Sequence, residues 1–311
     1  MVEVPLWAWV VFAGVLFALL VIDLIAHRGG RESSHKAAVV WSIIWVSAGL
    51  AFAGFVWAVL GGASANEYLA AYLLEKGLSL DNLFVFLIIF RSLSLEPASQ
   101  RKVLSWGIFG ALVFRGIFIF MGIAAMERYE WVKYIFGAIL IYAAIHALRE
   151  DPAEDKESSM VNWLSRHLPI TREVGEHQFT IVKDGKRFAT PLLLAVCAVE
   201  LTDIVFAIDS VPAALAVSRE EFVVYSSNAF AILGLRSLFL VLEGTISQLR
   251  YLHYGLAVVL AFAGAKIIAS EWIHLPALIS VAIIVVSIGA AAWASVIADR
   301  RDNRRAAANE G

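Results

Sequence analysis

Residues 37–66 read AAVVWSIIWVSAGLAFAGFVWAVLGGASAN, a run without a single Asp, Glu, Lys or Arg. Two further uncharged runs, Val4–Ile22 and Trp272–Ala298, lie near the two ends of the chain. A helix needs about 20 consecutive apolar residues to cross the hydrocarbon core of a bilayer. Each of these three runs is therefore long enough to form a membrane-spanning helix.

The composition of the whole chain supports the same class. Of 311 residues, 60% are hydrophobic and 17% are charged, and the mean hydropathy is +0.76. A soluble domain has about 45–50% apolar and about 25% charged residues. We therefore expect an all-α polytopic membrane protein, and we exclude a soluble enzyme and a nucleic-acid-binding protein. The one cysteine, Cys197, excludes an intramolecular disulfide and a thiolate metal cluster.

The alternation of apolar segments and polar breaks predicts nine spans in a single integral membrane domain that covers residues 1–311. Their approximate bounds are 6–26, 39–61, 66–90, 103–126, 131–149, 189–217, 221–243, 250–270 and 273–298. The longest connection is residues 150–188, in which 160–168 suggests a short interfacial helix. Residues 179–188 are either a small hairpin around an Asp-Gly turn or a plain linker. Residues 300–311 are expected to be a disordered tail.

The basic residues are distributed unevenly between the two sides of these spans. With the N-terminus outside, eighteen of the 25 Lys and Arg residues lie on the inner side, three lie on the outer side, and four fall within spans. Because Lys and Arg concentrate in cytoplasmic loops, this asymmetry places the N-terminus outside and the 150–188 loop and the C-terminus inside. The expected location is the plasma (inner) membrane.

Two segments of the chain resemble each other at several points. Acidic residues six positions apart occur in both, as Glu75 and Asp81 and as Asp203 and Asp209. The matches continue downstream in the same order: Arg115 with Arg236, Tyr134 with Tyr254, and His146 with Lys266. Spans 3–5 (about 66–149) and spans 6–8 (about 189–270) thus form two three-helix repeats. Because three is odd, the second repeat is inverted in the membrane, as in many secondary transporters.

Several acidic residues lie inside the expected spans. The deep ones are Glu75, Asp81, Glu200, Asp203 and Asp209. Asp23 lies nearer the inner end of the first span and is a candidate for the pathway. A charge at the bilayer centre costs about 2.5–3.5 kcal/mol on insertion scales, so five such residues indicate a function. The structural alternative is that they form salt bridges that hold helices together, and the bases available within spans are Lys76, Arg115, Arg236 and Lys266.

The residues that flank these acids suggest a binding chemistry. Asn82, Ser79, Ser210 and Thr202 add oxygen donors to the carboxylates. A site made only of oxygen ligands suits Mn²⁺, Ca²⁺ or Mg²⁺ and suits copper or zinc poorly. His253 and His274 lie near span ends, and His146 is the histidine that could be buried; as a lone residue it favours packing over ligation.

Helix geometry limits which acids can act together. Residues three apart share a face, so Glu200 and Asp203 can cooperate. Residues six apart point about 120° away from each other. Asp81 and Asp209 therefore meet only across the two repeats, or where a helix is broken. Pro212 predicts a break in the sixth span because it cannot donate a hydrogen bond to the helix. Gly77 either loosens the third span or serves packing.

Two stretches now resemble a known family. Residues 75–86 (EKGLSLDNLFVF) and 200–213 (ELTDIVFAIDSVPA) look like the paired signature stretches of the TerC family, supported by 233–236 (LGLR) and 251–254 (YLHY). The resemblance covers about residues 5–300. It implies a bacterial membrane protein linked to manganese export and tellurite resistance, distantly similar to the lysine-exporter superfamily. On this resemblance the metal-site residues are Glu75, Asp81, Asn82, Glu200, Asp203, Asp209 and Ser210.

The leading hypothesis is a transporter that exports a divalent cation, with Mn²⁺ first and Ca²⁺ as the alternative, and with proton coupling. The expected partners are the cation and the lipid bilayer, and no nucleic acid is expected. No tightly bound cofactor is expected either, and the sequence does not determine the oligomeric state. The second hypothesis is a non-transporting assembly or stress-resistance factor that binds partner membrane proteins. An enzyme is not expected, because the chain has no His-Glu-x-x-His pair, no Gly-x-Ser-x-Gly elbow and no phosphate-binding loop.

Overall fold

The structure, a computed structural model, describes residues 4–26, 35–149, 178–183, 186–243, 251–272 and 275–309. Within this part the chain is almost entirely helical. The helices are α1 (Leu6–Ala26), α2 (His35–Leu60), α3 (Gly62–Ser92), α4 (Pro97–Arg128), α5 (Val132–Arg149), α7 (Pro191–Val217), α8 (Glu221–Ile232), α9 (Leu235–Glu243), α10 (Leu252–Ile268) and α11 (Ala277–Asn309), with a short 3₁₀ turn, η2 (Ala269–Glu271), after α10. The strands β1 (Thr180–Lys183) and β2 (Lys186–Ala189) form one antiparallel pair.

By length and composition, α1, α2, α4, α7 and α11 are each able to cross a membrane, and the bent pair α8 and α9 passes the same test when the two helices are counted as one span. The shorter helices α5 and α10 are also apolar, while α3 is long but carries several charged residues. Each of the nine expected spans coincides with a helix or, for 221–243, with the pair α8 and α9. The prediction of an all-α polytopic membrane protein is confirmed.

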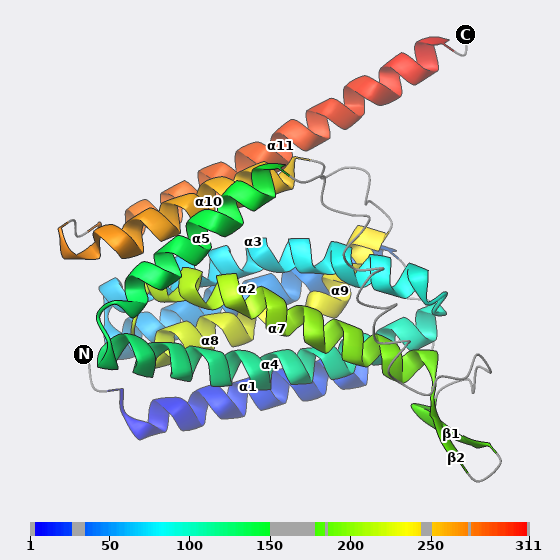
Figure 1. The fold of residues 1–311 in the computed structure, drawn as a ribbon, viewed down its shortest axis with the longest axis horizontal. Helices are drawn as coiled ribbons and strands as arrows, with labels where there is room; N and C mark the ends of the chain where they lie inside the picture. The colour runs from blue at the N-terminus through cyan, green and yellow to red at the C-terminus, as the bar shows by residue number, and fades with distance from the viewer. Residues whose placement is uncertain are drawn as a thin grey trace.

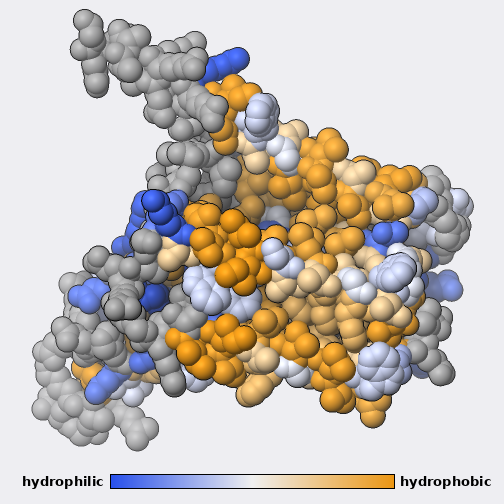
Figure 2. All heavy atoms as spheres, turned by 180° about the vertical axis from the view of Figure 1, so that it is seen from behind, coloured by the Kyte–Doolittle hydropathy of each residue, from blue (hydrophilic) through white to orange (hydrophobic). Residues whose placement is uncertain are grey.

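The outer surface has the character that lipid contact requires. Large apolar side chains such as Phe17, Trp57, Phe109 and Val286 are exposed by 60% or more. In Figure 2 apolar residues cover the middle of the face, while hydrophilic residues lie towards its two ends. An apolar surface of this extent is typical of a membrane or protein interaction site, and here the exposed apolar side chains belong to the helices.

The helices are arranged in layers. In Figure 1, α5, α10 and α11 lie together on one side of the bundle, α1 lies on the opposite side, and the remaining helices lie between them. The most extensive packing joins α5 to α10, α4 to α7 and α3 to α8. Each of these pairs takes one helix from residues 66–149 and one from residues 189–270. Packing of each helix of one repeat against a helix of the other is what a two-fold relation between the repeats would produce. The inverted repeat itself stays a prediction.

The interior contains two apolar clusters. One is aromatic and includes Phe12, Phe52 and Phe230, of which Phe52 and Phe230 stack with ring centroids 4.4 Å apart. The other is built around α3, α7 and α10 and contains many small side chains, such as Ala70 and Ala214. Small residues allow helix backbones to approach closely, which is how helices associate inside a bilayer.

The helix breaks differ from expectation. The prediction that Pro212 divides the sixth span is wrong, because α7 continues through Pro212 to Val217. The break lies instead in the seventh span, where α8 and α9 meet at an angle of 43°. α3 continues through Gly77, whose missing Cβ would lie 2.4 Å from Ile288 of α11, so Gly77 is a packing glycine.

The polar connections show a further confirmation and a further correction. The hairpin predicted at 179–188 is confirmed by the pairing of β1 with β2. The disordered tail expected at 300–311 is wrong for most of its length, because α11 continues to Asn309 and projects beyond the bundle (Figure 1). The helix expected at 160–168 lies outside the described residues.

Candidate functional site

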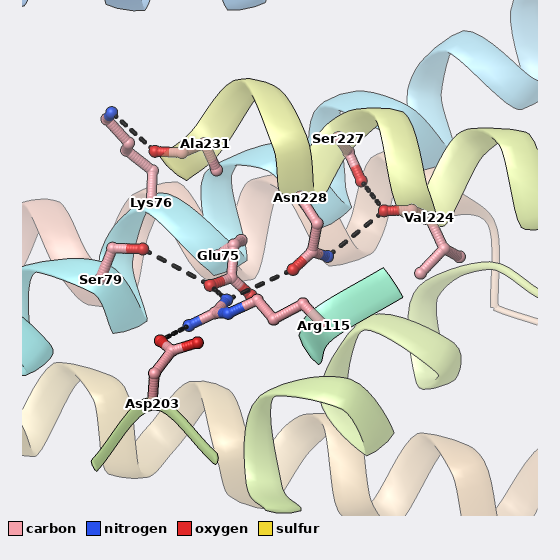
Figure 3. A network of polar contacts seen from close by, with 9 residues as sticks. All are labelled: Glu75, Lys76, Ser79, Arg115, Asp203, Val224, Ser227, Asn228 and Ala231. Atoms are coloured by element: carbon pink, nitrogen blue, oxygen red, sulfur yellow. Dashed lines mark hydrogen bonds and ion pairs between the residues drawn. The ribbon is translucent and has the colours of Figure 1, made fainter. Parts of the chain in front are cut away.

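Four helices bring polar side chains together in the middle of the bundle. They are α3, α4, α7 and α8, and their side chains surround the guanidinium of Arg115 (Figure 3). We call this group the Arg115 cluster, and its members are Glu75, Ser79, Asn82, Arg115, Asp203 and Asn228. All six are buried, with Glu75 and Ser79 fully inaccessible.

α3 contributes one polar stripe to this cluster. Glu75, Ser79 and Asn82 are spaced by four and three residues, so they share a face of the helix. The hydroxyl of Ser79 donates to Oε1 of Glu75 at 3.4 Å. With its amide turned to satisfy both groups, Asn82 donates to the carbonyl of Leu78 at 3.1 Å and accepts from Nη2 of Arg115 at 3.3 Å. The stripe therefore presents oxygen atoms towards α4.

Arg115 of α4 joins carboxylates from two other helices. Its Nη1 forms an ion pair with Oε1 of Glu75 on α3 and donates to Oδ1 of Asn228 on α8 at 3.3 Å. Its Nη2 pairs with Oδ1 of Asp203 on α7 at 3.1 Å. The planar guanidinium can serve several acceptors in fixed directions, which an ammonium cannot. A single cation thus connects one acid from each expected repeat.

The acids of the cluster retain unused oxygen atoms. Oε2 of Glu75 and Oδ2 of Asp203 are both buried and have no hydrogen-bond partner among the described residues. Buried polar atoms are nearly always hydrogen-bonded, so such atoms mark a place where a ligand can bind. Two carboxylates against one guanidinium also leave one excess negative charge when both acids are ionised.

Glu200 lies one turn before Asp203 on α7, as expected for residues three apart. Its carboxylate packs against Gly110 of α4, where an added Cβ would lie only 2.0 and 2.1 Å from its two oxygen atoms. Its Oε2 is buried without a hydrogen-bond partner in the described part of the chain, and the same holds for the hydroxyl of Ser210. Gly110 therefore gives the Glu200 carboxylate the space that it occupies.

Four of the seven expected metal ligands are not members of the Arg115 cluster: Glu200 and Ser210, described above, and Asp81 and Asp209. Asp209 is half-buried on α7. The backbone of Asp81 belongs to α3, and its side chain lies outside the described part of the structure. Among the described residues, no three Asp, Glu, His or Cys side chains gather in a group that could hold a metal ion. The full ligand set expected from the sequence stays a prediction.

The bases expected to balance these acids have different partners. Arg115 contacts two of the deep acids, Glu75 and Asp203. Arg236 pairs with Asp23 of α1 at 3.4 Å and donates to Ser105. Lys76 donates to backbone carbonyls, and Lys266 donates to the hydroxyl of Ser280 at 3.1 Å. Asp23, expected on the cation pathway, therefore forms an ion pair between α1 and α9.

Asn228 is a member of the cluster that the sequence reasoning missed. It follows two serines in α8, and all three side chains are buried. Ser227 donates to the carbonyl of Val224 within the helix at 2.9 Å, whereas Asn228 donates to the same carbonyl and still offers Oδ1 to Arg115. The run Ser-Ser-Asn in a predicted span was the available signal.

Known proteins resemble this chain over nearly its whole length. The chain is 39% identical over 295 residues to an uncharacterized membrane protein, STKORF319, of Myxococcus xanthus, covering 94% of this chain and 92% of that protein. It is 40% identical over 288 residues to the protein of Salmonella typhi assigned by name as the membrane-bound redox modulator Alx, covering 89% of each. It is 33% identical over 293 residues to an uncharacterized membrane protein of Rickettsia bellii, covering 93% of this chain and 97% of that protein.

No solved structure matches the chain. The family model described as "Integral membrane protein TerC family" matches residues 60–303, which include every helix from α3 to α10, most of α11, and all members of the Arg115 cluster. Since the model covers most of the chain and several relatives share more than a third of its residues, the chain belongs to the TerC family of integral membrane proteins.

Proposed function

We propose that this protein exports a divalent cation, with Mn²⁺ the expected substrate, from the cytoplasm across the inner membrane. The observation that carries the proposal is the pair of acids on Arg115. Glu75 and Asp203 come from different helices, are buried in the bundle core, and each keeps one carboxylate oxygen without a hydrogen-bond partner among the described residues. Buried ionisable groups within a membrane domain are expensive and are a functional-site hypothesis by default.

The charges of the site argue against a purely structural role. A scaffold of salt bridges needs about one base for each acid, whereas here one guanidinium serves two carboxylates. Glu200, one turn from Asp203, has no basic partner in the ion pairs of the described residues and adds further negative charge when it is ionised. A closed ion-pair network would have no excess negative charge, whereas a divalent cation would offset the excess that is found here.

The donor atoms favour a hard cation. Around Arg115 the available ligands are carboxylate oxygens and the amide oxygens of Asn82 and Asn228. Oxygen ligands of this kind suit Mn²⁺, Ca²⁺ and Mg²⁺, and Ca²⁺ remains the alternative substrate. Arg115 has the role of a resident counter-ion, which holds Glu75 and Asp203 in place when the cation is elsewhere. Asp81 and Asp209 complete the proposed coordination.

The same site supplies a route to coupling. When the cation leaves, carboxylates that crowd together in a medium of low dielectric constant repel one another. Uptake of protons relieves this repulsion, and their release allows the next cation to bind. Exchange of one Mn²⁺ for protons would therefore link cation export to proton movement into the cell. The proposed orientation, with the N-terminus outside and the C-terminus inside, makes the cytoplasmic side the loading side.

The test is uptake of radioactive manganese into inverted membrane vesicles, with Ca²⁺, Mg²⁺ and Zn²⁺ as competitors. Asp203→Asn and Glu75→Gln are nearly isosteric, so we expect normal amounts of protein in the membrane and loss of manganese uptake. Glu96→Gln is the matched control, because Glu96 is exposed at the start of α4 and its side chain makes no capping bond. Ca²⁺ and Mg²⁺ should compete more strongly than Zn²⁺.

The remaining acids are tested in the same way, with Asp81→Asn and Asp209→Asn expected to abolish uptake at normal abundance. The salt-bridge alternative predicts the opposite pattern, namely less protein in the membrane and residual molecules that still transport. If the wild-type protein produces no manganese uptake in vesicles, the second hypothesis, a membrane assembly or stress-resistance factor, is favoured instead.

A further inference from the structure

The junction of α8 and α9 exposes backbone groups inside the apolar bundle. α8 ends at Ile232 and α9 begins at Leu235, with a bend of 43° between them. The last carbonyl groups of any helix have no partner within that helix. Inside a membrane an unsatisfied backbone group costs several kcal/mol, so broken spans are tolerated only where other groups satisfy them.

The bend itself depends on a glycine. Gly234 has a φ of +80°, a left-handed conformation that side chains disfavour. Its missing Cβ would lie 2.6 Å from Cβ of Trp45 on α2, so no larger residue fits without movement. The residues at the junction are deeply buried, with Leu233 only 2% exposed. The break is therefore a built feature of the span rather than a frayed end.

The ammonium of Lys76 occupies this junction. Nζ donates to the carbonyl of Ala231 at 2.9 Å and to the carbonyl of Leu233 at 3.1 Å, and Figure 3 shows the side chain reaching the end of α8. Lys76 comes from α3, far away in the sequence. The C-terminal end of a helix carries partial negative charge, which a cation stabilises. Two carbonyl oxygens and a helix end thus form a cradle for a primary ammonium group.

The geometry points to a carbonyl-lined ammonium site at the break between α8 and α9. The side chain of Lys76 fills this site, and its ammonium sets the bend between the two helices. This inference stands on the contacts of Lys76 and does not depend on the proposed transport. It assigns Lys76 a positioning role that differs from the charge balancing of a carboxylate. Removal of the ammonium should leave a site that a free primary ammonium ion can enter.

The site connects two polar groups of the bundle. On α3, Lys76 directly follows Glu75, a member of the Arg115 cluster. Beyond the bend, α9 carries Arg236, which contacts Asp23 of α1 and Ser105 of α4. Since Lys76 holds the end of α8, the direction of α9 and the place of Arg236 depend on it. The ammonium therefore links the helix of the Arg115 cluster to the anchor of α9.

The experiment measures thermal unfolding of the purified protein in detergent, with and without added amines. Lys76→Ala should lower the melting temperature by several degrees. Millimolar n-propylammonium should restore most of this loss, because it carries three N–H donors and fits the space of the deleted side chain. Tetramethylammonium has no N–H donor and should restore nothing. Neither amine should shift the wild-type protein, whose site is filled. Lys102→Ala is the control, because Lys102 lies over the ring of Phe179, away from the break.

Equal effects of the two amines on Lys76→Ala, or no effect of either, would overturn the inference. If Lys76→Ala does not accumulate in the membrane, Lys76→Arg and Lys76→Met decide. Arginine can donate to both carbonyls and should keep the wild-type melting temperature, whereas methionine of similar length cannot and should lower it. Equal melting temperatures of these two variants would contradict a requirement for N–H donors at the break.

Discussion

Arg115→Lys is the substitution that tests the Arg115 cluster most directly. Arg115 uses two nitrogen atoms, Nη1 for Glu75 and Asn228 and Nη2 for Asp203. Lysine keeps the positive charge, but one compact ammonium cannot follow the planar fork and hold both carboxylates in these directions. We expect the ammonium to keep one carboxylate and release the other.

The size of the effect follows from the contact that is lost. A hydrogen bond that involves a charged group contributes about 1.5–3 kcal/mol. If both carboxylates must be held in place for the cation to bind and move, the lost free energy lowers the rate of transport. About 1.4 kcal/mol corresponds to a factor of ten in that rate. Arg115→Lys should therefore reduce manganese uptake by roughly ten- to a hundredfold, with near-normal amounts of protein in the membrane.

The assay is manganese uptake into inverted vesicles, normalised to the amount of protein in the membrane. Arg91→Lys is the matched control, because Arg91 is exposed in the last turn of α3 and should leave uptake unchanged. Arg115→Met should fail to accumulate, since breaking a buried ion pair by removing one partner costs about 3–5 kcal/mol. Wild-type uptake by Arg115→Lys at wild-type abundance would refute the reasoning, because it would show that the fork geometry is not needed.

Three further predictions concern other parts of the chain. Gly110→Ala places a Cβ 2.0 Å from the Glu200 carboxylate, where ordinary contact begins at 3.4 Å, so the carboxylate must retreat by about 1.4 Å and vesicle uptake should fall at least about tenfold; unchanged uptake would remove Glu200 from the site. Gly234→Ala imposes a left-handed conformation that costs about 1–2 kcal/mol and a clash with Trp45, so the melting temperature should fall, and a temperature equal to wild type would show that the bend relaxes freely. Ile170→Cys should not react with a membrane-impermeant thiol reagent in intact cells beyond the level of the parent protein, and strong labelling there would reverse the proposed orientation.

The helices of this protein were predictable because their signal is local. A span needs only enough consecutive apolar residues, and the first expected span, 6–26, has the same bounds as α1. The acids that matter for the site were visible for the same reason, since Glu75 and Asp203 interrupt runs that a bilayer would otherwise accept. The hairpin at 179–188 was read from its Asp-Gly turn, which is also a local signal.

The pairing of these groups was decided by tertiary structure alone. Arg115 could have met any deep acid, and only the packing of α4 against α7 and α8 places it between Glu75 and Asp203. Lys76 was expected to meet a carboxylate, but the nearest acceptors are the carbonyls of a helix break that hydropathy does not reveal. The sequence determines which residues the membrane must accommodate, because the cost of transfer into lipid depends on each residue by itself. Which cation meets which acceptor depends on distances between helices far apart in the chain, and these distances exist only once the bundle has packed.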